Sequence, residues 1–513
     1  MVAMPGRAYV DLMAGQRARP LNGTFNRVPV LHSNQPEEVE GPGILINTAP
    51  GTAWAAENGQ PLRNAEFTFQ GEFGMHLHHK YFPPYRASIR ASERRTELTL
   101  AAILINPGYR PVHIRFENGA VRNSFEAPYL ANNLMGVKPL GPRPWNTGPG
   151  DATAVQMLRG KLDNRLVDEI TIPPRSRIVL FQTPLPALGI ANALLRGKSD
   201  GPFHIAVVAA RNPTSDGDLI AVLDSARLAP GRTYLNQLRE IEARQVFSRV
   251  GGVALGDTYA ASIRHDLTRD GALHVPFTST PRHHFGTRDV QVNPLAVRML
   301  DSAVDNIGTY GVRFNVDLQL QGAGSYELVM SHPARAGGQP FTAFRGSLQI
   351  VSPEGLREVH VGLRSGQSLS LTSLLLQPGR PQTVRVSMVY PADATPGHLL
   401  SVVPTAQFAM VQQRERQLEI ARREAQRTAP PAVPPAPAGA TPAALMQRPL
   451  PAAPPLLPAP AYAPLRLTMP SMPVPPPLVP GSLVPPPPSA GQVDRYRQAV
   501  DAQQRELQRW QDR

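Results

Sequence analysis

Apolar and polar residues alternate along several short segments of the chain, and this pattern predicts strands. In segment 97–105, Leu98, Leu100, Ala102 and Leu104 occupy every second position. A period of two is typical of a strand that buries one face. Pro and Gly residues separate such segments, as expected for tight turns, because Pro presets one backbone dihedral and Gly accepts a positive φ. The pattern predicts a mainly β protein with a few short helices.

The second half of the chain repeats the order of strands and turns seen in the first half. Three segments of the first half and their counterparts are 105–116 with 320–330, 169–181 with 374–386, and 200–209 with 395–403. Short strands separated by Pro/Gly turns favour antiparallel β-sandwiches. We therefore expect two tandem antiparallel β-sandwich-like domains, 19–244 and 245–407. One larger barrel-like unit is the alternative.

Beyond the second domain the composition changes sharply. Residues 408–427 lack Pro and Gly and predict a helix, whereas 428–490 are Pro-rich and predict a disordered linker. Such a segment favours the extended polyproline II conformation and forms no core. It would serve as a spacer or as a ligand for an SH3-like groove. Residues 491–513 again predict an amphipathic helix. At the other end, residues 1–18 form an N-terminal segment that we interpret as the remnant of a leader.

Composition and charge exclude several classes of protein. The 513 residues include no Cys, so disulfides, zinc–thiolate sites and cysteine nucleophiles are excluded. The formal net charge is +13, which favours polyanionic partners or a generally basic surface. The Arg residues are scattered rather than grouped, so we expect no nucleic-acid partner. No apolar run approaches the ~18 residues that a transmembrane helix requires.

Nine segments are specific when taken together, although none is so singly: 21–48, 67–80, 95–114, 175–186, 199–210, 247–259, 286–316, 344–350 and 386–402. Together they resemble a cyanobacterial domain-of-unknown-function family, family 3370. They follow the order of the family and span roughly residues 19–404. The family is uncharacterised and its members are usually exported, with a secretion signal just before the segment that matches Arg19, Pro20 and Leu21. The resemblance therefore implies a lineage and export, but no mechanism.

Three histidines are the candidate metal ligands. His76 and His78 lie on one face of the expected strand 67–80, together with Glu72, while His79 lies on the other face. Imidazole and carboxylate groups bind divalent transition metals, although a complete site needs ligands from elsewhere. The alternative is a hydrogen-bonded pair of histidines at a sheet edge. We expect no other cofactor.

The terminal helix is the candidate partner-binding element. Val493, Val500 and Leu507 recur every seven residues, and Tyr496 and Trp510 follow at the second seam position of the heptad. An isolated helix of this length is marginal in water, so an apolar stripe indicates a partner. The partner would be the body of the protein, the 408–427 helix or another copy. A solvated terminal helix is the alternative.

Other motifs favour structure over chemistry. Asp216, Gly217 and Asp218 lack the spacing of a calcium loop, and we expect Asp218 to cap a helix over 218–228. His283 and His284 fall in a turn-rich stretch that we expect to be a loop. The nucleophile elbow, the zinc-protease motif and the phosphate-binding loop are all missing from the sequence.

These observations favour a non-enzymatic structural or binding protein of the cell envelope or surface. Its expected partner is an envelope protein or an anionic glycan. The alternative is a glycan-binding or glycan-cleaving module acting on envelope polysaccharide, since a pair of carboxylates brought together only by folding is invisible in one sequence. We expect a periplasmic or extracellular protein if a leader is encoded upstream, and a cytoplasmic one if Met1 is the true start.

Overall fold

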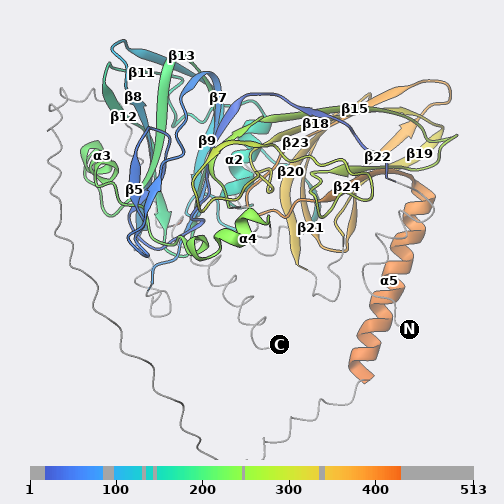
Figure 1. The fold of residues 1–513 in the computed structure, drawn as a ribbon. Helices are drawn as coiled ribbons and strands as arrows, with labels where there is room; N and C mark the ends of the chain where they lie inside the picture. The colour runs from blue at the N-terminus through green and yellow to red at the C-terminus, as the bar shows by residue number, and fades with distance from the viewer. Residues whose placement is uncertain are drawn as a thin grey trace, which may run out of the picture. The chain divides into compact units, whose positions relative to one another are not determined.

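The computed structural model describes residues 18–84, 97–129, 135–142, 147–244, 249–333, 341–428 and 491, and the structural statements below concern these residues. The described chain is mainly β, with several sheets and few helices (Figure 1), as the alternating pattern predicts. The terminal residues Val493, Tyr496, Val500, Leu507 and Trp510 lie outside the described residues, as do residues 1–17 and almost all of the Pro-rich stretch.

The first half of the chain builds a two-layered sheet network around one core. Its eleven described strands are β2 (Pro29–Ser33), β3 (Glu38–Val39), β4 (Gly43–Asn47), β7 (Phe69–Tyr81), β8 (Glu97–Asn106), β9 (Val112–Asn123), β11 (Glu169–Ile172), β12 (Ser176–Pro186), β13 (Ile190–Ala210), β14 (Gly251–Leu255) and β17 (Leu295–Arg298). A separate two-stranded sheet joins β5 (Thr52–Trp54) to β6 (Pro61–Arg63).

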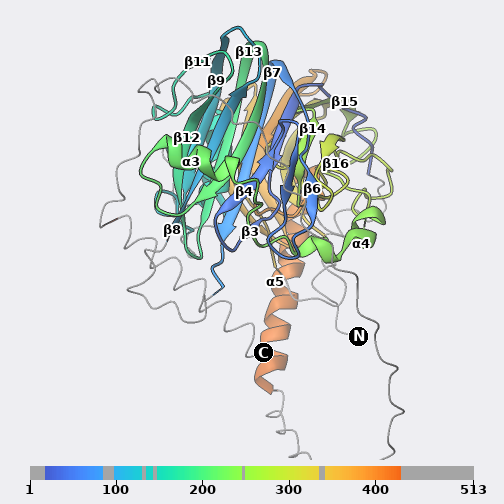
Figure 2. The ribbon, with the colours of Figure 1, turned by 60° about the vertical axis from the view of Figure 1, so that its left-hand side comes forward.

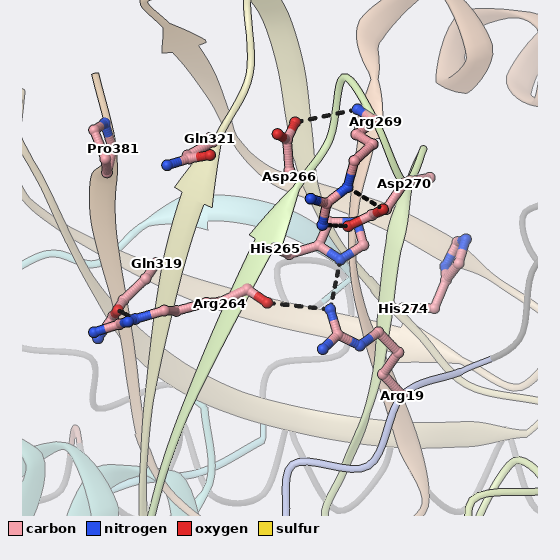
Figure 3. Close-up of a pocket in the computed structure, with 11 residues that line it drawn as sticks. Arg19, Arg264, His265, Asp266, Arg269, Asp270, His274, Gln319, Gln321 and Pro381 are labelled. Carbon is pink, nitrogen blue, oxygen red and sulfur yellow. Dashed lines mark hydrogen bonds and ion pairs between the residues drawn. The ribbon is translucent and has the colours of Figure 1, made fainter. Parts of the chain in front are cut away.

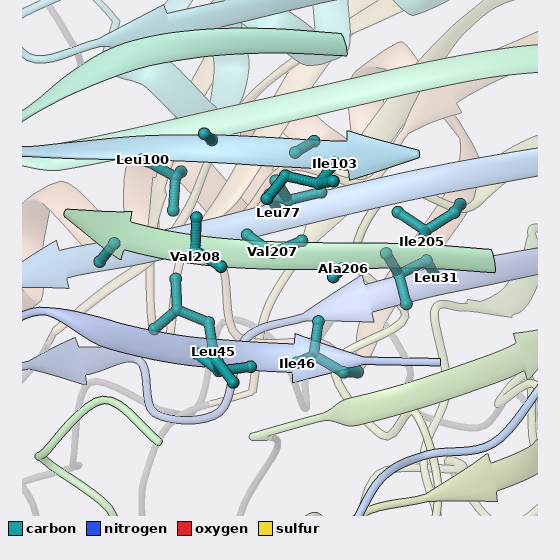
Figure 4. Packing of buried hydrophobic residues seen from close by; sticks show 14 of the residues in the cluster. Leu31, Leu45, Ile46, Leu77, Leu100, Ile103, Ile205, Ala206, Val207 and Val208 are labelled. Atoms are coloured by element: carbon teal, nitrogen blue, oxygen red, sulfur yellow. The ribbon is translucent and has the colours of Figure 1, made fainter. Parts of the chain in front are cut away.

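The long strand β13 connects the two layers. Its residues from Ile190 to Ser199 pair with β7 and β9, and Phe203 still pairs with β7. The residues from His204 to Ala210 pair instead with β8 and, over part of their length, with β4. The register shifts between Ser199 and Phe203, where the strand passes from one layer to the other. Figure 4 shows apolar side chains of β13 packed among those of its neighbours. A strand that changes layers in this way forms a corner of the sandwich.

The turn at residues 106–108 joins two strands that do not pair with each other as a hairpin would. Strand β8 forms as the alternation over 97–105 predicts, but it pairs with β12 and β13, while β9 pairs with β11 and β13. The turn therefore connects the two layers instead of closing a hairpin. Its Asn106 side chain donates hydrogen bonds to the carbonyls of Arg110, Ile172 and Pro173, which fixes the turn against the next connection.

The second half of the chain builds a second pair of sheets around its own core. The larger sheet contains β1 (Thr24–Phe25), β10 (Gly136–Pro139), β15 (Thr258–Asp266), β18 (Arg313–Gln321), β20 (Thr342–Ser352), β21 (Gly355–Arg364) and β23 (Gln382–Val389). The smaller sheet contains β16 (Leu273–Phe277), β19 (Gly324–Ser331), β22 (Ser368–Leu376) and β24 (His398–Pro404). Buried side chains from both sheets form one apolar cluster.

The two sandwiches exchange strands. Strands β14 and β17 follow residue 244 in sequence but pair within the first network, and β1 and β10 precede it but pair within the second. Most of the described pairs are antiparallel, as expected, but β2–β7, β3–β7 and β15–β18 are parallel. The apolar cores nevertheless divide close to the expected boundary. The limits 19–244 and 245–407 stay a prediction.

Short helices cover and connect the sheets. Helix α2 (Pro149–Leu158) contacts β9 and β13 of the first network and β20 and β23 of the second. Helix α3 (Asp216–Asp224) packs against β4, β12 and β13 (Figure 2). A 3-10 turn, η3 (Thr233–Asn236), is followed by the short α4 (Leu238–Glu242).

The cap of α3 corrects one expectation. Ser215, rather than Asp218, is the N-cap residue, and its side chain accepts a hydrogen bond from the Asp218 amide. The Asp218 carboxylate in turn accepts from the amides of Thr214 and Ser215. This reciprocal arrangement is a capping box. The Asp218 carboxylate therefore caps the helix, as the sequence predicts, but it does so from the third helical position.

Helix α5 (Thr405–Thr428) begins directly after β24, close to the predicted start at residue 408. Phe408 and Val411 on its first turns are buried with Ala272, Val329 and Val403. Thr405 donates a hydrogen bond to the buried carboxylate of Glu327 on β19. Among the described residues, none belongs to a helix long and apolar enough to cross a membrane.

Candidate functional site

The three candidate histidines lie on β7, an interior strand flanked by β2 and β13 and not a sheet edge. All three side chains are buried, with at most 1% exposure. His76 and His78 share one face, and their ring centroids are 6.5 Å apart with nearly parallel planes. Alternation along the strand places His79 on the other face. Because these rings are shielded from solvent, their hydrogen-bonding partners determine whether a ring nitrogen is left to bind a metal.

His79 has both ring nitrogens occupied by protein groups. Its Nδ1 donates to the carbonyl of Pro36 at 2.7 Å, so its Nε2 accepts from the Ser33 hydroxyl at 2.8 Å. Burial lowers the pKa of His79 to about 3. This ring is therefore neutral and fully hydrogen-bonded, with no lone pair left for a metal.

His76 forms a buried imidazole pair with His32 from the neighbouring strand β2. The two Nδ1 atoms are 3.2 Å apart, so one ring donates and the other accepts. Burial lowers the pKa of His32 to about 3, and that of His76 well below its ordinary value. The ring of His76 also packs against Tyr310 at 5.9 Å. The structure thus separates His76 from His79 and gives each a different partner.

His78 joins a cluster that the sequence did not reveal, with Glu37 and Asp393. The potential ligand atoms of these three residues all lie within 4.8 Å of one another. The His78 Nε2 is 3.5 Å from the Asp393 Oδ1. Glu37 follows β2 and Asp393 lies between β23 and β24, so the cluster joins the two sandwiches. Two carboxylates and one imidazole form a donor set suited to a divalent cation.

Lys80 already occupies the cation position of this cluster. Its Nζ lies 2.7 Å from the Glu37 Oε1 and 2.7 Å from the Asp393 Oδ1. Arg249 forms a further ion pair with Glu37, and the Tyr129 hydroxyl donates to Asp393 at 3.0 Å. We call Glu37, His78, Lys80, Arg249 and Asp393 the ionic cluster.

Electrostatics within the ionic cluster favour the charged forms of Glu37, Lys80 and Asp393. Burial alone would raise the pKa of Glu37 and of Asp393, but the neighbouring cations hold both below their ordinary values. Burial alone would lower the pKa of Lys80, but the two carboxylates raise it. A metal ion would therefore have to displace a tethered ammonium group that both carboxylates already bind.

The tautomer of His78 also opposes metal binding. The amide group of Asn192 satisfies its neighbours when its nitrogen donates to the His78 Nδ1 at 3.0 Å and its oxygen accepts from Thr153 at 2.6 Å. The His78 Nδ1 is then an acceptor, and the proton lies on Nε2, which faces Asp393. That nitrogen would have to lose its proton before it could bind a metal.

A second group of polar side chains lines a pocket of about 670 Å³ at one end of the second sandwich (Figure 3). Arg264 and His265 come from the end of β15, Arg269 from the following turn, and Arg19 from the segment before β1. Arg269 is paired with the adjacent Asp270, with contacts of 2.8 and 2.9 Å. By contrast, Arg19 and Arg264 have no carboxylate within 4.0 Å among the described residues.

Arg19 is held in the pocket by uncharged groups. Its Nη1 donates to the His265 Nδ1 at 2.8 Å and to the Arg264 carbonyl at 3.1 Å. Because a guanidinium only donates, the His265 Nδ1 accepts, and its Nε2 donates to the Gly271 carbonyl at 2.9 Å. Arg264 donates to the side-chain oxygen of Gln319 at 2.6 Å. The pocket therefore contains two guanidinium groups that form no ion pair within the described part of the chain, although Arg19 lies near enough to Asp270 to help lower the pKa of its carboxyl group.

A family model described as "Protein of unknown function (DUF3370)" matches residues 16–404. The chain belongs to this family. The matched DUF3370 region contains every residue of the ionic cluster and of the Arg-lined pocket. A search of curated proteins found no match.

Solved structures add little to the DUF3370 match. One that is similar to this chain is a Paenibacillus xanthan lyase, at 8% sequence identity and a TM-score of 0.16. The similarity covers 72% of this chain and 27% of the lyase, so the chain spans about a quarter of that enzyme's length. A TM-score this low carries no argument about fold or function.

The sequence revealed one member of the ionic cluster and none of the Arg-lined pocket. His78 attracted notice through its two neighbouring histidines. Lys80 follows His78 by two positions, but nothing local marks it as a member of a cluster, and Glu37 and Asp393 lie far from it in sequence. Arg19 is 245 positions from Arg264. Scattered charged residues of this kind look like an ordinary solvated surface until the fold brings them together.

Proposed function

We propose that this DUF3370 protein is a non-enzymatic structural or binding protein of the cell envelope, and that its partner is an anionic envelope glycan. The observation that carries the proposal is the Arg-lined pocket, where Arg19 and Arg264 present guanidinium groups without carboxylate partners. Guanidinium groups bind carboxylates and other oxyanions with two parallel hydrogen bonds. The net charge of +13 adds a longer-range attraction for a polyanion.

Glycan cleavage is the second candidate, because the pocket also contains the carboxylates of Asp266 and Asp270. A glycosidase needs one carboxylic acid whose raised pKa keeps it protonated as the general acid. The hydrogen bond from Arg269 instead lowers the pKa of Asp270. Asp266 accepts hydrogen bonds from the amides of Thr268 and Arg269. Asp270 is thus held as an ionised acceptor, and Asp266 accepts backbone hydrogen bonds, an arrangement that favours binding over cleavage.

Export and an envelope location belong to this proposal and rest on the family resemblance. Fractionation of native cells with an antibody tests the location. We expect the protein in the envelope or extracellular fraction, and we expect concentrated salt to release it, because salt screens charge–charge attraction. Protein found only in the cytosol would contradict the proposed location.

A further inference from the structure

The ionic cluster brings a lysine amine and an aspartate carboxyl group into contact across the two sandwiches. The Lys80 Nζ on β7 lies 2.7 Å from the Asp393 Oδ1, and the carboxyl carbon of Asp393 is one bond beyond that oxygen. Groups held with their reacting atoms about 3–3.5 Å apart reach effective concentrations of about 10⁵–10⁸ M. This contact therefore has the geometry of the two reactants of an amide-forming step.

Glu37 is placed to move protons between these two groups. Its Oε1 lies 2.7 Å from the Lys80 Nζ, and one oxygen of Glu37 lies within 4.8 Å of one oxygen of Asp393. Arg249 forms an ion pair with Oε2, the other carboxylate oxygen of Glu37, and so leaves Oε1 to the lysine. Glu37 is thus within hydrogen-bonding reach of the amine, as a general base requires.

Two hydrogen-bond donors face the Asp393 carboxyl group. The Tyr129 hydroxyl donates to its Oδ2 at 3.0 Å, and the protonated Nε2 of His78 lies 3.5 Å from its Oδ1. Donors in such positions stabilise the negative charge that develops on a carboxyl oxygen when an amine adds to the carbon. The arrangement assigns different fates to the two oxygens, because Oδ2 is held by tyrosine while Oδ1 faces the lysine.

We propose that Lys80 and Asp393 form an intramolecular amide bond, with Glu37 as the catalytic residue. One proton of the Lys80 ammonium group passes through Glu37 to the Asp393 carboxylate, which leaves a neutral amine and a neutral carboxylic acid. The amine adds to the carboxyl carbon, a second proton passes through Glu37 to Oδ1, and this oxygen leaves as water. A C–N bond replaces the bond from the carbon to Oδ1, Glu37 ends as it began, and no oxidant is needed.

The charges of the cluster slow this reaction, whereas burial favours its product. The two carboxylates hold the pKa of Lys80 above its ordinary value, so the neutral amine forms only transiently and the bond forms slowly after folding. Only 23% of the Lys80 side chain and 22% of the Asp393 side chain are exposed. Conversion of the ion pair into a neutral amide removes the free-energy cost of keeping both charges away from water.

The amide bond would join β7 of the first sandwich to the connection between β23 and β24 of the second. Such a link holds the two halves together even when the surrounding strands are pulled apart. It goes beyond the proposed function and does not depend on glycan binding, although a covalent link of this kind suits a structural protein of the cell envelope.

The test is the intact mass of the full chain under denaturing conditions, followed by mapping of its proteolytic peptides. We expect wild type to weigh about 18 Da less than its sequence, the mass of one water molecule. We expect the peptides that contain Lys80 and Asp393 to stay joined. Lys80→Arg should have its full mass, because a guanidinium keeps the positive charge but does not release a proton. Glu37→Gln should slow the loss of mass by about a hundredfold.

Lys198→Arg is the matched control, since it makes the same substitution at an exposed lysine outside the ionic cluster. We expect it to lose the same mass as wild type. Full mass in wild type after prolonged incubation would show that Lys80 and Asp393 form an ion pair only. A loss of mass that persists in Lys80→Arg would come from other residues and would also overturn the proposed bond. The wild-type peptide map decides the question even where a variant fails to fold, and neither result bears on glycan binding.

Discussion

At Lys80 the chain places its own ammonium group where a divalent cation would otherwise bind. The two carboxylates that hold it, Glu37 and Asp393, come from different sandwiches, and each lies 2.7 Å from the Nζ. The cluster therefore serves as an internal ionic junction. Because the cation belongs to the chain itself, Lys80 links the two sandwiches without a bound metal ion.

Replacing Lys80 should convert the ionic cluster into a metal site. In Lys80→Met the two carboxylates lose their main counter-ion, so we expect a lower melting temperature that Zn²⁺ restores. A ligand that binds only the native state stabilises it by mass action, by about 2.7 kcal/mol at a hundredfold excess over the dissociation constant. Adding His78→Ala should abolish this rescue. Thermal unfolding with and without Zn²⁺ provides the measurement.

Wild type provides the decisive comparison for this prediction. Its melting temperature should respond to Zn²⁺ or Ni²⁺ no more than that of a variant with Ala at His76, His78 and His79. A large shift confined to wild type would mean that a metal displaces Lys80 in the native protein.

Arg232 and Asp301 form a second ion pair, and neither side chain has any exposure to solvent. The Arg232 Nη1 donates to both carboxylate oxygens at 3.0 Å, and its Nη2 donates to the Leu45 carbonyl at 2.6 Å. Removing one partner of a buried pair leaves an uncompensated charge, which costs about 3–5 kcal/mol. We therefore expect Asp301→Ala to lower the free energy of unfolding by that amount.

Urea denaturation measures this loss. Asp317→Asn is the control, because its ion pair with Arg385 is partly exposed and such pairs contribute about 1 kcal/mol or less. Equal losses of unfolding free energy in Asp301→Ala and Asp317→Asn would show that burial does not increase the contribution of the Arg232–Asp301 pair.

At the scale of secondary-structure elements, sequence periodicity predicts strands well and their pairing poorly. The alternation in β8, β9 and β18 is visible because one face of each strand is buried. Nothing local indicates that β13 would pair with four strands in two layers. Nor does local sequence place β14 and β17 in the first network, because pairing between distant strands depends on the whole fold.

The same reasoning explains the outcome for the candidate site. The His76–His78–His79 motif correctly marks a strand with polar side chains on both faces. Its partners, His32, Ser33 and Asp393, come from segments that only the folded chain brings near. A histidine motif alone therefore could not distinguish a metal site from a buried hydrogen-bond network.

The terminal helix remains a prediction of the sequence. Helix α5 begins on the second sandwich, and residues 493–513 would dock on it, on the body or on another copy. We expect deletion of 493–513 either to reduce the mass measured by light scattering or to reduce hydrogen-exchange protection in the surface that the helix covers. Unchanged mass, together with no protection at Val500 or Leu507 in the full chain, would leave only a solvated terminal helix.

At the scale of the whole molecule, buried neutral histidines dominate the expected response to pH. Ten of the thirteen histidines are buried. Burial lowers the pKa of His32, His76, His79, His274, His332 and His398 below the ordinary value of about 6.5. The unfolded chain therefore binds more protons than the native protein between pH 6.5 and about 4, and protonation favours unfolding.

We expect the free energy of unfolding to be constant above about pH 7 and to fall steeply below pH 6.5. Each such histidine contributes a slope of about 1.4 kcal/mol per pH unit once its unfolded form is protonated. Lowered carboxylate pKa values, as in Asp163 and Asp393, extend the loss below pH 4. Urea denaturation across this pH range measures the slope. A flat profile between pH 7 and 5 would mean that the buried rings bind protons in the native state.

The charges of the ionic cluster are paired with one another, whereas Arg19 and Arg264 remain available at the surface. The proposed function depends on this contrast. The most direct measurement is incubation of the purified full chain with acidic polysaccharide isolated from the native envelope. Sedimentation of the complex measures binding, and release of new chain ends measures cleavage. We predict salt-sensitive co-sedimentation without new chain ends. Failure to bind, or the steady appearance of shorter chains, would contradict a non-enzymatic glycan-binding protein.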